Sequence, residues 1–585
     1  MAERLVPQLA WPLDATLTLP GSKSAANRLL VLAALATASG APVVVSGATP
    51  SDDVQHLVAG LEAFGFDVHW TASDTLTLAP RGPNPPRSGH LHCGNAGTAL
   101  RFLTALAALL PGTWTLDGEA ALRRRPIGPL AHALRELGAE VEDTAGCPPV
   151  RVRGGTLQGS RCTLDASASG QFASALLLVG SQLPHGLELQ FAGPVASYDY
   201  VAWTAALLRE RGLRIELTPS HARLHPGTPS GGSYAVEGDW SAFGTFACLS
   251  FLTGSRLSGR NLPQPSQQAD ARLGPLLAQL AGSGPRTLDV SSQPDQFLNL
   301  AAVAALRPGT TTFTGGANLR HKESDRIAAM ATGLHALGGS AQARPDGLVV
   351  HGGQPLHGGH IDPQADHRVA MAFALLGLFV PGVHIAAPEC VAKSYPGFWD
   401  DLEWLLTQRR CIAVVGMRGA GKSTFARAFA AATDTVCVDL DAQFVQAHGP
   451  IAPYVAAHGW PAFRDQESAL LAAALQPGAV VATGGGAIER AANRRLLAER
   501  ALVVWLDGDV GLLRARLVGD TVRPSLTGAP VGEEVAAVLA QRQPLYTAAA
   551  TVRIPAALPT AEQVALARRC LGAPCQMFGK HKPGN

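Results

Sequence analysis

One short pattern recurs along the first part of this chain and constrains its fold more than any other feature. In each copy an amphipathic helical segment ends in glycine, and a short segment of alternating polar and apolar residues follows. The copies end at Gly65, Gly138, Gly212, Gly282 and Gly338, and the copy at 277–282 is the loosest. Glycine suits the left-handed position that terminates a helix, and period-two alternation predicts a strand. Helix–glycine–strand is common in any α/β protein, but five copies favour a repeated βαβ-type unit.

The length and composition predict a large multidomain protein without a nucleic-acid or membrane partner. The 585 residues predict roughly two to four domains, and the net charge of +2 gives no polybasic surface. The nine scattered cysteines contain no CxxC pair, so we expect reduced thiols. Apolar stretches at 29–38 and 369–383 are shorter than the roughly 18–20 residues that span a membrane, and we expect buried helices there. The reduced thiols and the absence of a spanning segment predict a cytoplasmic protein, and we further expect a monomer.

A glycine-rich loop near residue 420 predicts a nucleotide site. Residues 416–424 fit the pattern G-x-x-x-x-G-K-S, directly after the apolar strand expected at 411–415. Such a loop turns its backbone N–H groups toward phosphate at the start of a helix. Lys422 adds a charge at the β- and γ-phosphates, and the Ser423 hydroxyl suits magnesium.

Two carboxylates follow the next expected strand. Asp439 is placed to hold magnesium through water, and Asp441 to accept a proton from a substrate hydroxyl. The alternative is that both aspartates only cap a loop. Further on, Gly484–Gly486 follow another strand and let a small polar ligand touch the backbone.

These motifs occur in one order over about 411–575: the phosphate loop, Asp-x-Asp, Phe463-Arg464-x-x-Glu467, Gly484–Gly486, Arg523-Pro524 and Arg542-x-Pro544-x-Tyr546. The segment resembles shikimate kinase. The resemblance implies a shikimate site of Asp441, Arg464, Gly485, Gly486 and Arg542, and an ATP site of Gly419, Ala420, Gly421, Lys422, Ser423, Thr424 and Arg523, the last on a lid. It implies ATP and Mg²⁺ as cofactors, with Ser423 and Asp439 at the metal and Lys422 and Asp441 as catalytic groups. A gluconate- or nucleotide-type kinase is the alternative. Arg464 and Arg542 favour a carboxylate substrate, because an arginine fork matches a carboxylate.

The first 400 residues carry several cationic motifs at expected helix starts. They are Pro20-Gly-Ser-Lys23-Ser24-Ala-Ala-Asn-Arg28, Gly94-Asn-Ala-Gly97-Thr-Ala-Leu-Arg101, Arg125-Pro-Ile-Gly128, Lys322-Glu323-Ser-Asp325-Arg326 and Asp366-His-Arg368, followed by Lys393. A single charge run is usually a solvated surface. Helix starts already favour anions, however, and several of them in one domain predict that more than one multiply charged anion is bound.

These motifs resemble 5-enolpyruvylshikimate-3-phosphate (EPSP) synthase over nearly all of residues 5–405. The resemblance implies an α/β fold with two lobes of repeated βαβαββ units, one at about 21–227 and one at about 228–407 together with 1–20. A linker at 408–410 then leads to a P-loop kinase domain at 411–575 with a parallel, nucleoside-monophosphate-kinase-like sheet, and 576–585 form a tail. The two activities implied are phosphorylation of shikimate and transfer of enolpyruvyl from phosphoenolpyruvate to its product.

The same resemblance implies the site residues of the transferase, which needs no metal or cofactor. Shikimate 3-phosphate is expected at Lys23, Ser24, Arg28, Ser169, Gln171, Ser197, Tyr200, Asp295, Asn318 and Lys322. Phosphoenolpyruvate is expected at Lys23, Gly97, Arg125, Gln171, Arg326, Arg368 and Lys393, with Arg123 as the alternative to Arg125. Asp295 and Glu323 are the expected base and acid in either order, and Lys23 and Lys322 complete the catalytic set. The family has Ser-Ser-Gln where this chain has Ser169-Gly170-Gln171, so one hydroxyl is missing although the Gly170 N–H can still donate.

Two other functions for the chain are disfavoured by single features. A transferase acting on UDP-N-acetylglucosamine carries a cysteine in the loop that corresponds to 119–126, and this loop has none. A non-catalytic metabolite sensor is expected to have lost catalytic groups, yet Lys422, Asp441, Asp295, Glu323 and Lys322 are all present.

Overall fold

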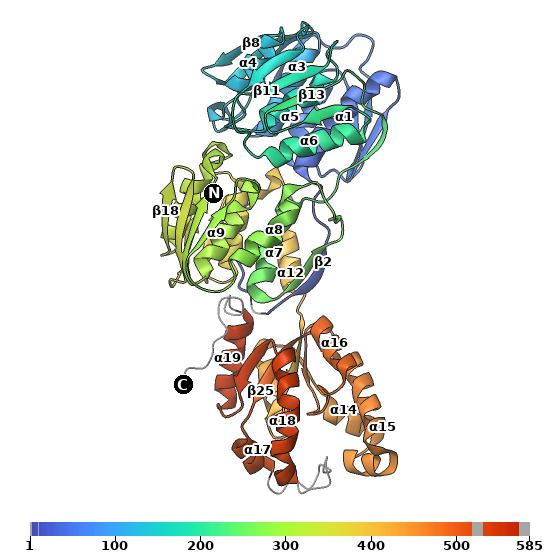
Figure 1. The fold of residues 1–585 in the computed structure, drawn as a ribbon, viewed down its shortest axis with the longest axis vertical. Helices are drawn as coiled ribbons and strands as arrows, with labels where there is room; N and C mark the ends of the chain where they lie inside the picture. The colour runs from blue at the N-terminus through green and yellow to red at the C-terminus, as the bar shows by residue number, and fades with distance from the viewer. Residues whose placement is uncertain (1–2, 10, 518–530, 573–585) are drawn as a thin grey trace. The chain divides into compact units, whose positions relative to one another are not determined.

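The structure is a computed structural model that describes residues 3–9, 11–517 and 531–572. Its contacts divide the chain into two compact units (Figure 1). The first holds residues 1–8, 16–248 and 258–401, and the second holds 9–15, 249–257 and 402–585. The segments 9–15 and 249–257 thus group by contact with residues 402–585, although their sequence position predicted that they belong with the domain at 1–407.

Four sheets of the first unit share one topology, which confirms the predicted repeat. In strand order they are β14-β3-β5-β4, β6-β7-β9-β8, β10-β11-β13-β12 and β16-β17-β19-β18. In each sheet the first two strands pair in parallel, and the remaining pairs are antiparallel. Because a parallel pair needs a crossover, a helix connects the parallel strands in three of these sheets, where the unit is βαβαββ: α3 (Gly97–Leu109), α5 (Gln171–Gly180) and α9 (Phe297–Leu306).

The strands of these sheets are β3 (Val43–Ser46), β4 (Asp67–Ala72), β5 (Thr75–Ala79), β6 (Ser88–His92), β7 (Gly112–Asp117), β8 (Glu140–Thr144), β9 (Cys147–Gly154), β10 (Arg161–Leu164), β11 (Leu187–Phe191), β12 (Ile215–Leu217), β13 (His221–Leu224), β14 (Gly232–Ala235), β16 (Arg286–Asp289), β17 (Gly309–Thr314), β18 (Ser340–Arg344) and β19 (Gly347–Gly352). A further sheet joins β1 (Glu3–Leu5), β21 (Val383–Ala386) and β20 (Gly359–Ile361).

The strand β14 corrects the lobe boundary expected at 227–228. Residues 232–235 pair in parallel with β3 and complete the first lobe's own sheet. The chain thus supplies the first strand of that unit after the other two units of the lobe are finished. This pairing joins segments far apart in sequence, so the boundary follows β14 rather than preceding it.

Four of the five repeat glycines have equivalent places. Gly65, Gly138, Gly212 and Gly338 each lie at positive φ between a helix and the third strand of a unit. Gly282 also has positive φ, but it follows the short helix α8 (Leu273–Gln279) and leads to a first strand, β16. The loosest copy of the pattern is therefore a different connection and not a member of the repeat.

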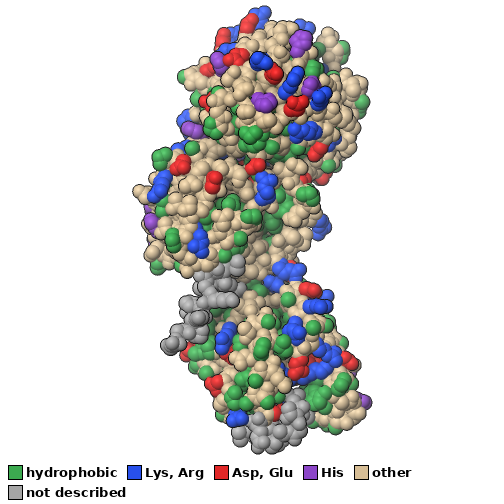
Figure 2. Space-filling view, viewed as in Figure 1, with side chains coloured by type: hydrophobic (Ala, Val, Ile, Leu, Met, Phe, Trp, Pro, Cys, Tyr) green, Lys and Arg blue, Asp and Glu red, His purple; other side chains and the backbone are tan. Residues whose placement is uncertain are grey.

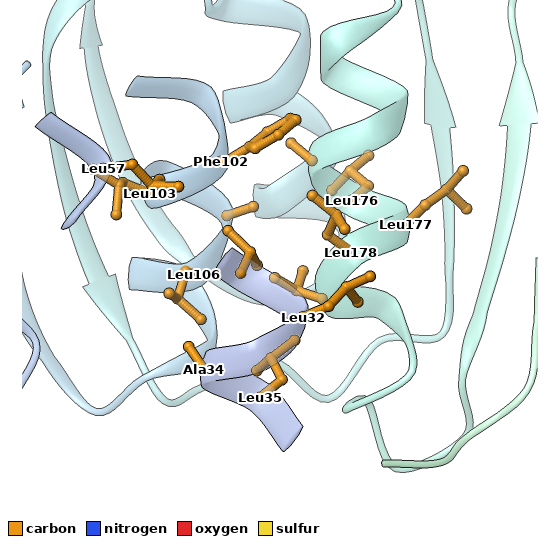
Figure 3. Packing of buried hydrophobic residues seen from close by; sticks show 14 of the residues in the cluster. Leu32, Ala34, Leu35, Leu57, Phe102, Leu103, Leu106, Leu176, Leu177 and Leu178 are labelled. Carbon is orange, nitrogen blue, oxygen red and sulfur yellow. The ribbon is translucent and has the colours of Figure 1, made fainter. Parts of the chain in front are cut away.

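The helices of the first lobe bury their apolar side chains against one another. Figure 3 shows leucines of α1 (Lys23–Ala36), α3 (Gly97–Leu109) and α5 (Gln171–Gly180) turned toward a common core. Leu32, Leu106 and Leu177 are each 0% exposed there. Burying a leucine contributes roughly 1.5–3 kcal/mol, so this helical layer anchors the helix ends that reach the site.

The two apolar stretches considered in the sequence form buried helices in this unit. Residues 29–36 belong to α1, and 369–377 belong to α11 (His367–Gly377). Among the described residues, no helix combines the length and apolar character that crossing a bilayer requires. On the face that Figure 2 shows, basic and acidic side chains are interspersed over each unit.

The second unit contains a parallel sheet, as the sequence predicts. Its strand order is β23-β24-β22-β25-β26, and all its pairs are parallel. The strands are β22 (Cys411–Val415), β23 (Val436–Asp439), β24 (Ala479–Ala482), β25 (Ala501–Asp507) and β26 (Val552–Pro555). The central strand β22 is buried along its whole length, which explains its continuous apolar run.

The short connection at 408–410 is hydrogen bonded within this unit. The Asp14 N–H donates to the Gln408 carbonyl at 2.9 Å, and the Arg410 N–H donates to the Pro12 carbonyl at 2.7 Å. The Trp11 indole also donates to the Arg410 carbonyl. The connection is therefore a paired segment rather than a free linker.

Candidate active sites

A polar cavity in the first unit brings together most residues expected in the transferase site. It is lined by Lys23, Ser24, Arg28, Thr98, Arg101, Arg125, Ala168, Ser169, Gly170, Gln171, Ser197, Tyr200, Asp295, Asn318, His321, Lys322, Glu323, Arg326 and Arg368. The helices α1, α5, α10 (Arg326–Ala336) and α11 begin at or next to lining residues. Helix starts favour anions, so the cavity combines their dipoles with the cationic side chains.

Gly97 and Lys393 do not line the cavity, but each contacts it through one neighbour. A Cβ built on Gly97 lies only 2.5 Å from the Cζ atom of Arg125, so the absent side chain leaves room for that guanidinium. Lys393 lies next to Lys23 through a shared carboxylate, described below. Both expected positions are thus part of the same cationic cluster.

The structure separates the two candidate arginines of the 123–125 loop. Arg125 is 5% exposed, lines the cavity and lies 3.8 Å from the Glu323 carboxylate. Arg123 has an exposed side chain that pairs with Asp117 at 2.6 Å, and it does not line the cavity. The loop turns at Arg125, which is extended after the short helix η2 (Leu122–Arg124).

The two candidate carboxylates lie among cations. Asp295 is 2.8 Å from Arg326, 3.2 Å from Arg368 and 3.6 Å from Lys322. Burial alone raises the pKa of Asp295, but these three cations outweigh it and hold the pKa well below its usual range. Asp295 is therefore an ionised carboxylate.

Glu323 has the same ionisation from a different set of neighbours. It pairs with Arg326 at 2.9 Å. Burial opposes its charge, but Arg326 and Arg125 lower the pKa of Glu323 well below its usual range, and Lys393 and Lys23 add to the effect. Both candidate groups thus start without a proton, and one of them must gain a proton before it can act as an acid.

The buried carboxylate of Asp53 links Lys23 and Lys393, and no sequence motif had indicated this role. Asp53 lies 3.0 Å from Lys23 Nζ and 2.7 Å from Lys393 Nζ, and its side chain is 2% exposed. Lys393 also donates to the Asn95 carbonyl at 2.7 Å. Burial lowers the pKa of Lys23, but the carboxylates of Asp53 and Glu323 leave that pKa above its ordinary value. Asp53 therefore favours the charged form of Lys23 and holds the two lysine side chains close together.

Two more buried residues had no role in the sequence analysis. Arg101 lines the cavity and donates to Gln171 Oε1 at 2.6 Å, which orients an expected ligand contact. Asp366 caps α11 through the Arg368 N–H and accepts from Arg326 Nε at 2.8 Å. Both residues belong to the cationic motifs of the sequence, Arg101 to 94–101 and Asp366 to 366–368. Only their tertiary contacts show that they act at the cavity.

The second candidate site lies at the carboxyl edge of the parallel sheet. The strands β22, β23 and β24 end at Val415, Asp439 and Ala482, and the phosphate loop, Asp441 and the glycines follow them. In the loop, Gly416, Gly419 and Gly421 all have positive φ, which a side chain disfavours. The helix α13 (Lys422–Thr433) begins directly after it, so the expected phosphate-loop residues are a turn at Gly419, Ala420 and Gly421 and the first helical turn at Lys422, Ser423 and Thr424.

A second cavity joins this loop to the expected substrate residues. Its lining is Arg418, Lys422, Asp441, Ile451, Trp460, Phe463, Arg464, Glu467, Gly484, Gly485 and Gly486. Arg542, expected beside Arg464, is not in the lining. Its Nη1 atom lies 3.6 Å from a Cβ built on Gly485, so the guanidinium lies just behind the glycines. Arg523, expected on a lid, lies outside the described residues.

Asp439 has a capping role as well as a position near the phosphate loop. Its Oδ1 accepts the N–H groups of Asp441 and Ala442 at 3.1 and 3.3 Å and caps α14 (Leu440–His448). The loop-capping alternative therefore holds for Asp439, although its second oxygen is not used by these bonds. A serine hydroxyl and a carboxylate oxygen are hard ligands that suit Mg²⁺. Among the described residues there is no cluster of three or more His, Cys, Asp or Glu side chains that could hold a metal by itself.

Three lining residues of this cavity had no assigned role. Glu467 is buried and pairs with Arg464 at 2.7 Å. The Trp460 ring lies under Arg464 at 5.3 Å and under Arg418 at 5.8 Å. These contacts hold Arg464 toward the cavity. Trp460 and Arg464 lie four residues apart in α15 (Ile451–Ala474), after its kink at Gly459, so helical spacing makes their side chains neighbours.

Comparisons with known proteins find relatives of both segments of the chain. The family model for EPSP synthase (3-phosphoshikimate 1-carboxyvinyltransferase) matches residues 8–402, and the model for shikimate kinase matches 418–569. A 3-phosphoshikimate 1-carboxyvinyltransferase of Rhizobium leguminosarum is 37% identical over 402 residues, which cover 67% of this chain and 94% of that protein. The EPSP synthase structure of Acinetobacter baumannii has a TM-score of 0.57 at 25% identity and covers 69% of this chain and 98% of that chain.

A longer relative resembles both segments together. The pentafunctional AROM polypeptide of Clavispora lusitaniae is 31% identical over 607 residues, which cover 90% of this chain and 38% of that protein. The chain therefore belongs to the EPSP synthase family, carries a shikimate kinase domain after it, and is a bifunctional enzyme of the shikimate pathway.

Proposed function

We propose how the residues of the two cavities divide this chemistry. In the first cavity the 5-hydroxyl of shikimate 3-phosphate adds to phosphoenolpyruvate, and phosphate leaves. In the second cavity the 3-hydroxyl of shikimate attacks the γ-phosphate of ATP. The observation that carries the first assignment is one cavity in which two ionised carboxylates, Asp295 and Glu323, are surrounded by cations from several helix starts.

The cations of the first cavity suit two different groups of phosphoenolpyruvate. Arg326 and Arg368 flank Asp295, and an arginine fork suits the planar carboxylate. Lys23, Lys393 and Arg125 lie around Glu323 and suit the phosphate that will leave. Shikimate 3-phosphate takes the remaining polar lining at Ser24, Arg28, Ser169, Gln171, Ser197, Tyr200, Asn318 and Lys322.

The same neighbours favour Asp295 as the base and Glu323 as the acid. Asp295 contacts Lys322, on the shikimate 3-phosphate side, so it lies where the 5-hydroxyl proton must go. Arg326 and Arg125, with Lys393 and Lys23, hold Glu323 ionised, and the carboxylate and phosphate of bound phosphoenolpyruvate will neutralise these cations. Binding of phosphoenolpyruvate then raises the pKa of Glu323, so that it can carry a proton to the methylene carbon. Loss of that proton from the methyl group later accompanies departure of phosphate.

The second cavity places both reaction partners in one space. Lys422 and Asp441 both line it, so the γ-phosphate and the shikimate hydroxyl meet between a cation and a base. Arg464, Gly485 and Gly486 form the far wall, and Arg542 stands behind it. Mg²⁺ neutralises phosphate charge when bound, with Ser423 and Asp439 as its protein oxygens. The cytoplasmic location and the monomeric state stay predictions from the sequence.

Two assays test these assignments on the full chain. Phosphate release from phosphoenolpyruvate is expected only when shikimate 3-phosphate is present, and ADP release from ATP only when shikimate and Mg²⁺ are present. Gluconate or a nucleoside monophosphate in place of shikimate should give no ADP above background. Equal ADP release with gluconate would overturn the substrate assignment of the second cavity.

A further inference from the structure

Glu489, a glutamate outside the sequence motifs, forms ion pairs with Arg542 and Arg464 at the kinase cavity. Glu489 follows the three glycines and precedes α16 (Ala491–Arg500). Its Oε1 atom accepts from Arg542 Nε at 2.8 Å and lies 2.7 Å from Nη2, and its Oε2 atom lies 3.6 Å from Arg464 Nη2. One carboxylate thus bridges both arginines proposed to hold the carboxylate of shikimate.

The two arginines depend on Glu489 to different degrees. Arg464 has a second, buried partner in Glu467 at 2.7 Å. Among the residues that the structure describes, Glu489 is the carboxylate paired with Arg542, whose side chain is only 3% exposed. A buried guanidinium without a counter-charge is costly. Glu489 therefore supplies the charge that Arg542 requires while the cavity is empty.

The Glu489 side chain can move away from the two arginines at little cost in free energy. Its side chain is 42% exposed, so its carboxylate regains water when it releases the arginines. The Tyr546 hydroxyl donates to the Gly485 carbonyl at 2.7 Å and holds the glycine wall in front of Arg542 independently of Glu489. The wall and the arginines can thus stay in place while this one side chain swings out.

We propose that Glu489 is a competing carboxylate: it occupies Arg542 and Arg464 in the empty kinase cavity, and the substrate carboxylate must displace it. This inference rests on the proposed function of the cavity. When the substrate carboxylate displaces Glu489, one anion replaces another on the arginines, so the exchange has a small free-energy cost. A neutral analogue cannot replace the anion and leaves Glu489 in place. Glu489 thereby lowers the affinity of the kinase cavity for shikimate.

The test is the Glu489→Gln variant of the full chain, assayed for ADP formation without phosphoenolpyruvate. Glutamine keeps the shape but cannot compete as an anion. If Glu489 has released Arg542 and Arg464 in about one tenth of the wild-type molecules, the KM of the variant for shikimate should be lower on the order of tenfold. Its kcat and its KM for ATP should be nearly unchanged. A role in positioning Arg542 gives the opposite result, because the KM would then rise.

Two control variants and one analogue make the result specific. Glu499→Gln, at an exposed position on α16, should leave the KM for shikimate unchanged. Glu467→Gln, which removes the buried partner of Arg464, should raise it. Shikimate methyl ester has no anion to exchange, so its KM or inhibition constant should be the same in wild type and Glu489→Gln.

The outcomes separate this inference from the assignment beneath it. If the wild-type chain forms no ADP with shikimate, the kinase assignment fails. If the wild type is active but Glu489→Gln has an unchanged or higher KM, only the competing-carboxylate proposal fails. An equal gain for the methyl ester would also overturn it, since the effect would not depend on charge. Transferase activity and circular dichroism verify that each variant is folded.

Discussion

At the scale of single residues, the transferase cavity depends on charges that balance in pairs. Asp53 is the sharpest case because it lies between two lysines and is almost fully buried. Removing one partner of a buried ion pair costs about 3–5 kcal/mol. We expect Asp53→Asn to lower kcat/KM for phosphoenolpyruvate about 100-fold or more, because the two lysines then repel each other and separate.

The neighbouring aspartate provides a matched control for this substitution. Asp52 begins the same helix, α2 (Asp52–Ala63), but is exposed. Asp52→Asn should retain the wild-type transferase rate, and kinase activity should be unchanged in both variants. Wild-type kcat/KM in Asp53→Asn, measured by phosphate release, would show that the lysines need no shared carboxylate.

The raised pKa of the buried Asp270 carboxyl predicts that the stability of the folded protein depends on pH. Asp270 accepts from the Tyr200 hydroxyl at 2.8 Å and from Gln296 Nε2 at 3.1 Å, yet burial and the charge of Asp295 raise its pKa to about 6. The folded-state pKa lies above the unfolded one, so the folded protein binds the proton more tightly. The cost of the buried charge is therefore absent below about pH 4 and fully present above about pH 6.

The Asp270→Asn variant measures this cost. It should stabilise the transferase unit by about 1–3 kcal/mol at pH 7.5, and the gain should shrink as the pH falls toward 4.5. Scanning calorimetry gives the transition, which is identified by its shift when shikimate 3-phosphate is added. A gain that is the same at both pH values would contradict a charge effect.

At the scale of elements, the site is built from helix starts whose backbone geometry limits side chains. Gly170 precedes α5, and a Cβ built there lies 2.4 Å from the Ala196 carbonyl oxygen. Restoring the family's serine therefore forces the backbone of one helix start to move. We expect Gly170→Ser to raise the KM for shikimate 3-phosphate about tenfold, on the order of 1.4 kcal/mol, despite the added hydroxyl.

Gly193 offers a control for this prediction. It lies in the loop after β11, and a Cβ there meets nothing within 4 Å. Gly193→Ser should leave both KM values and the melting temperature unchanged. Tighter binding of shikimate 3-phosphate by Gly170→Ser would mean that the backbone accommodates the serine and that the missing hydroxyl weakens the native enzyme.

At the scale of the whole molecule, each activity has its residues within one contact unit. The transferase lining lies entirely in the first unit and the kinase lining entirely in the second. Lys422→Ala removes the cation at the transferring phosphate and should lower shikimate phosphorylation at least about 1000-fold, on the order of 4 kcal/mol. Transferase activity with added shikimate 3-phosphate should be unchanged.

The reciprocal variant completes the experiment. Asp295→Ala should abolish phosphate release while ADP formation from shikimate continues at the wild-type rate. A loss of transferase activity in Lys422→Ala, with normal circular dichroism, would show that the two units do not act independently.

The sequence by itself determined the class of fold and the local chemistry. The glycine-terminated repeat predicted βαβαββ units because helix ends and strand alternation are local properties, and four sheets share that topology. The phosphate loop was predictable for the same reason, since its glycines and the following helix are contiguous in the chain. Cationic motifs at helix starts likewise predicted anion sites without knowledge of the packing.

Tertiary structure alone decided which distant residues meet. Asp53 resembles any aspartate at a helix start until Lys23 and Lys393 are brought to either side of it. The strand β14 could not be assigned to its sheet, because its partner β3 is distant in sequence and pairing leaves no local signal. Glu489 shows the same limit at the kinase site, since a lone exposed glutamate acquires a role only through two arginines that the fold places beside it.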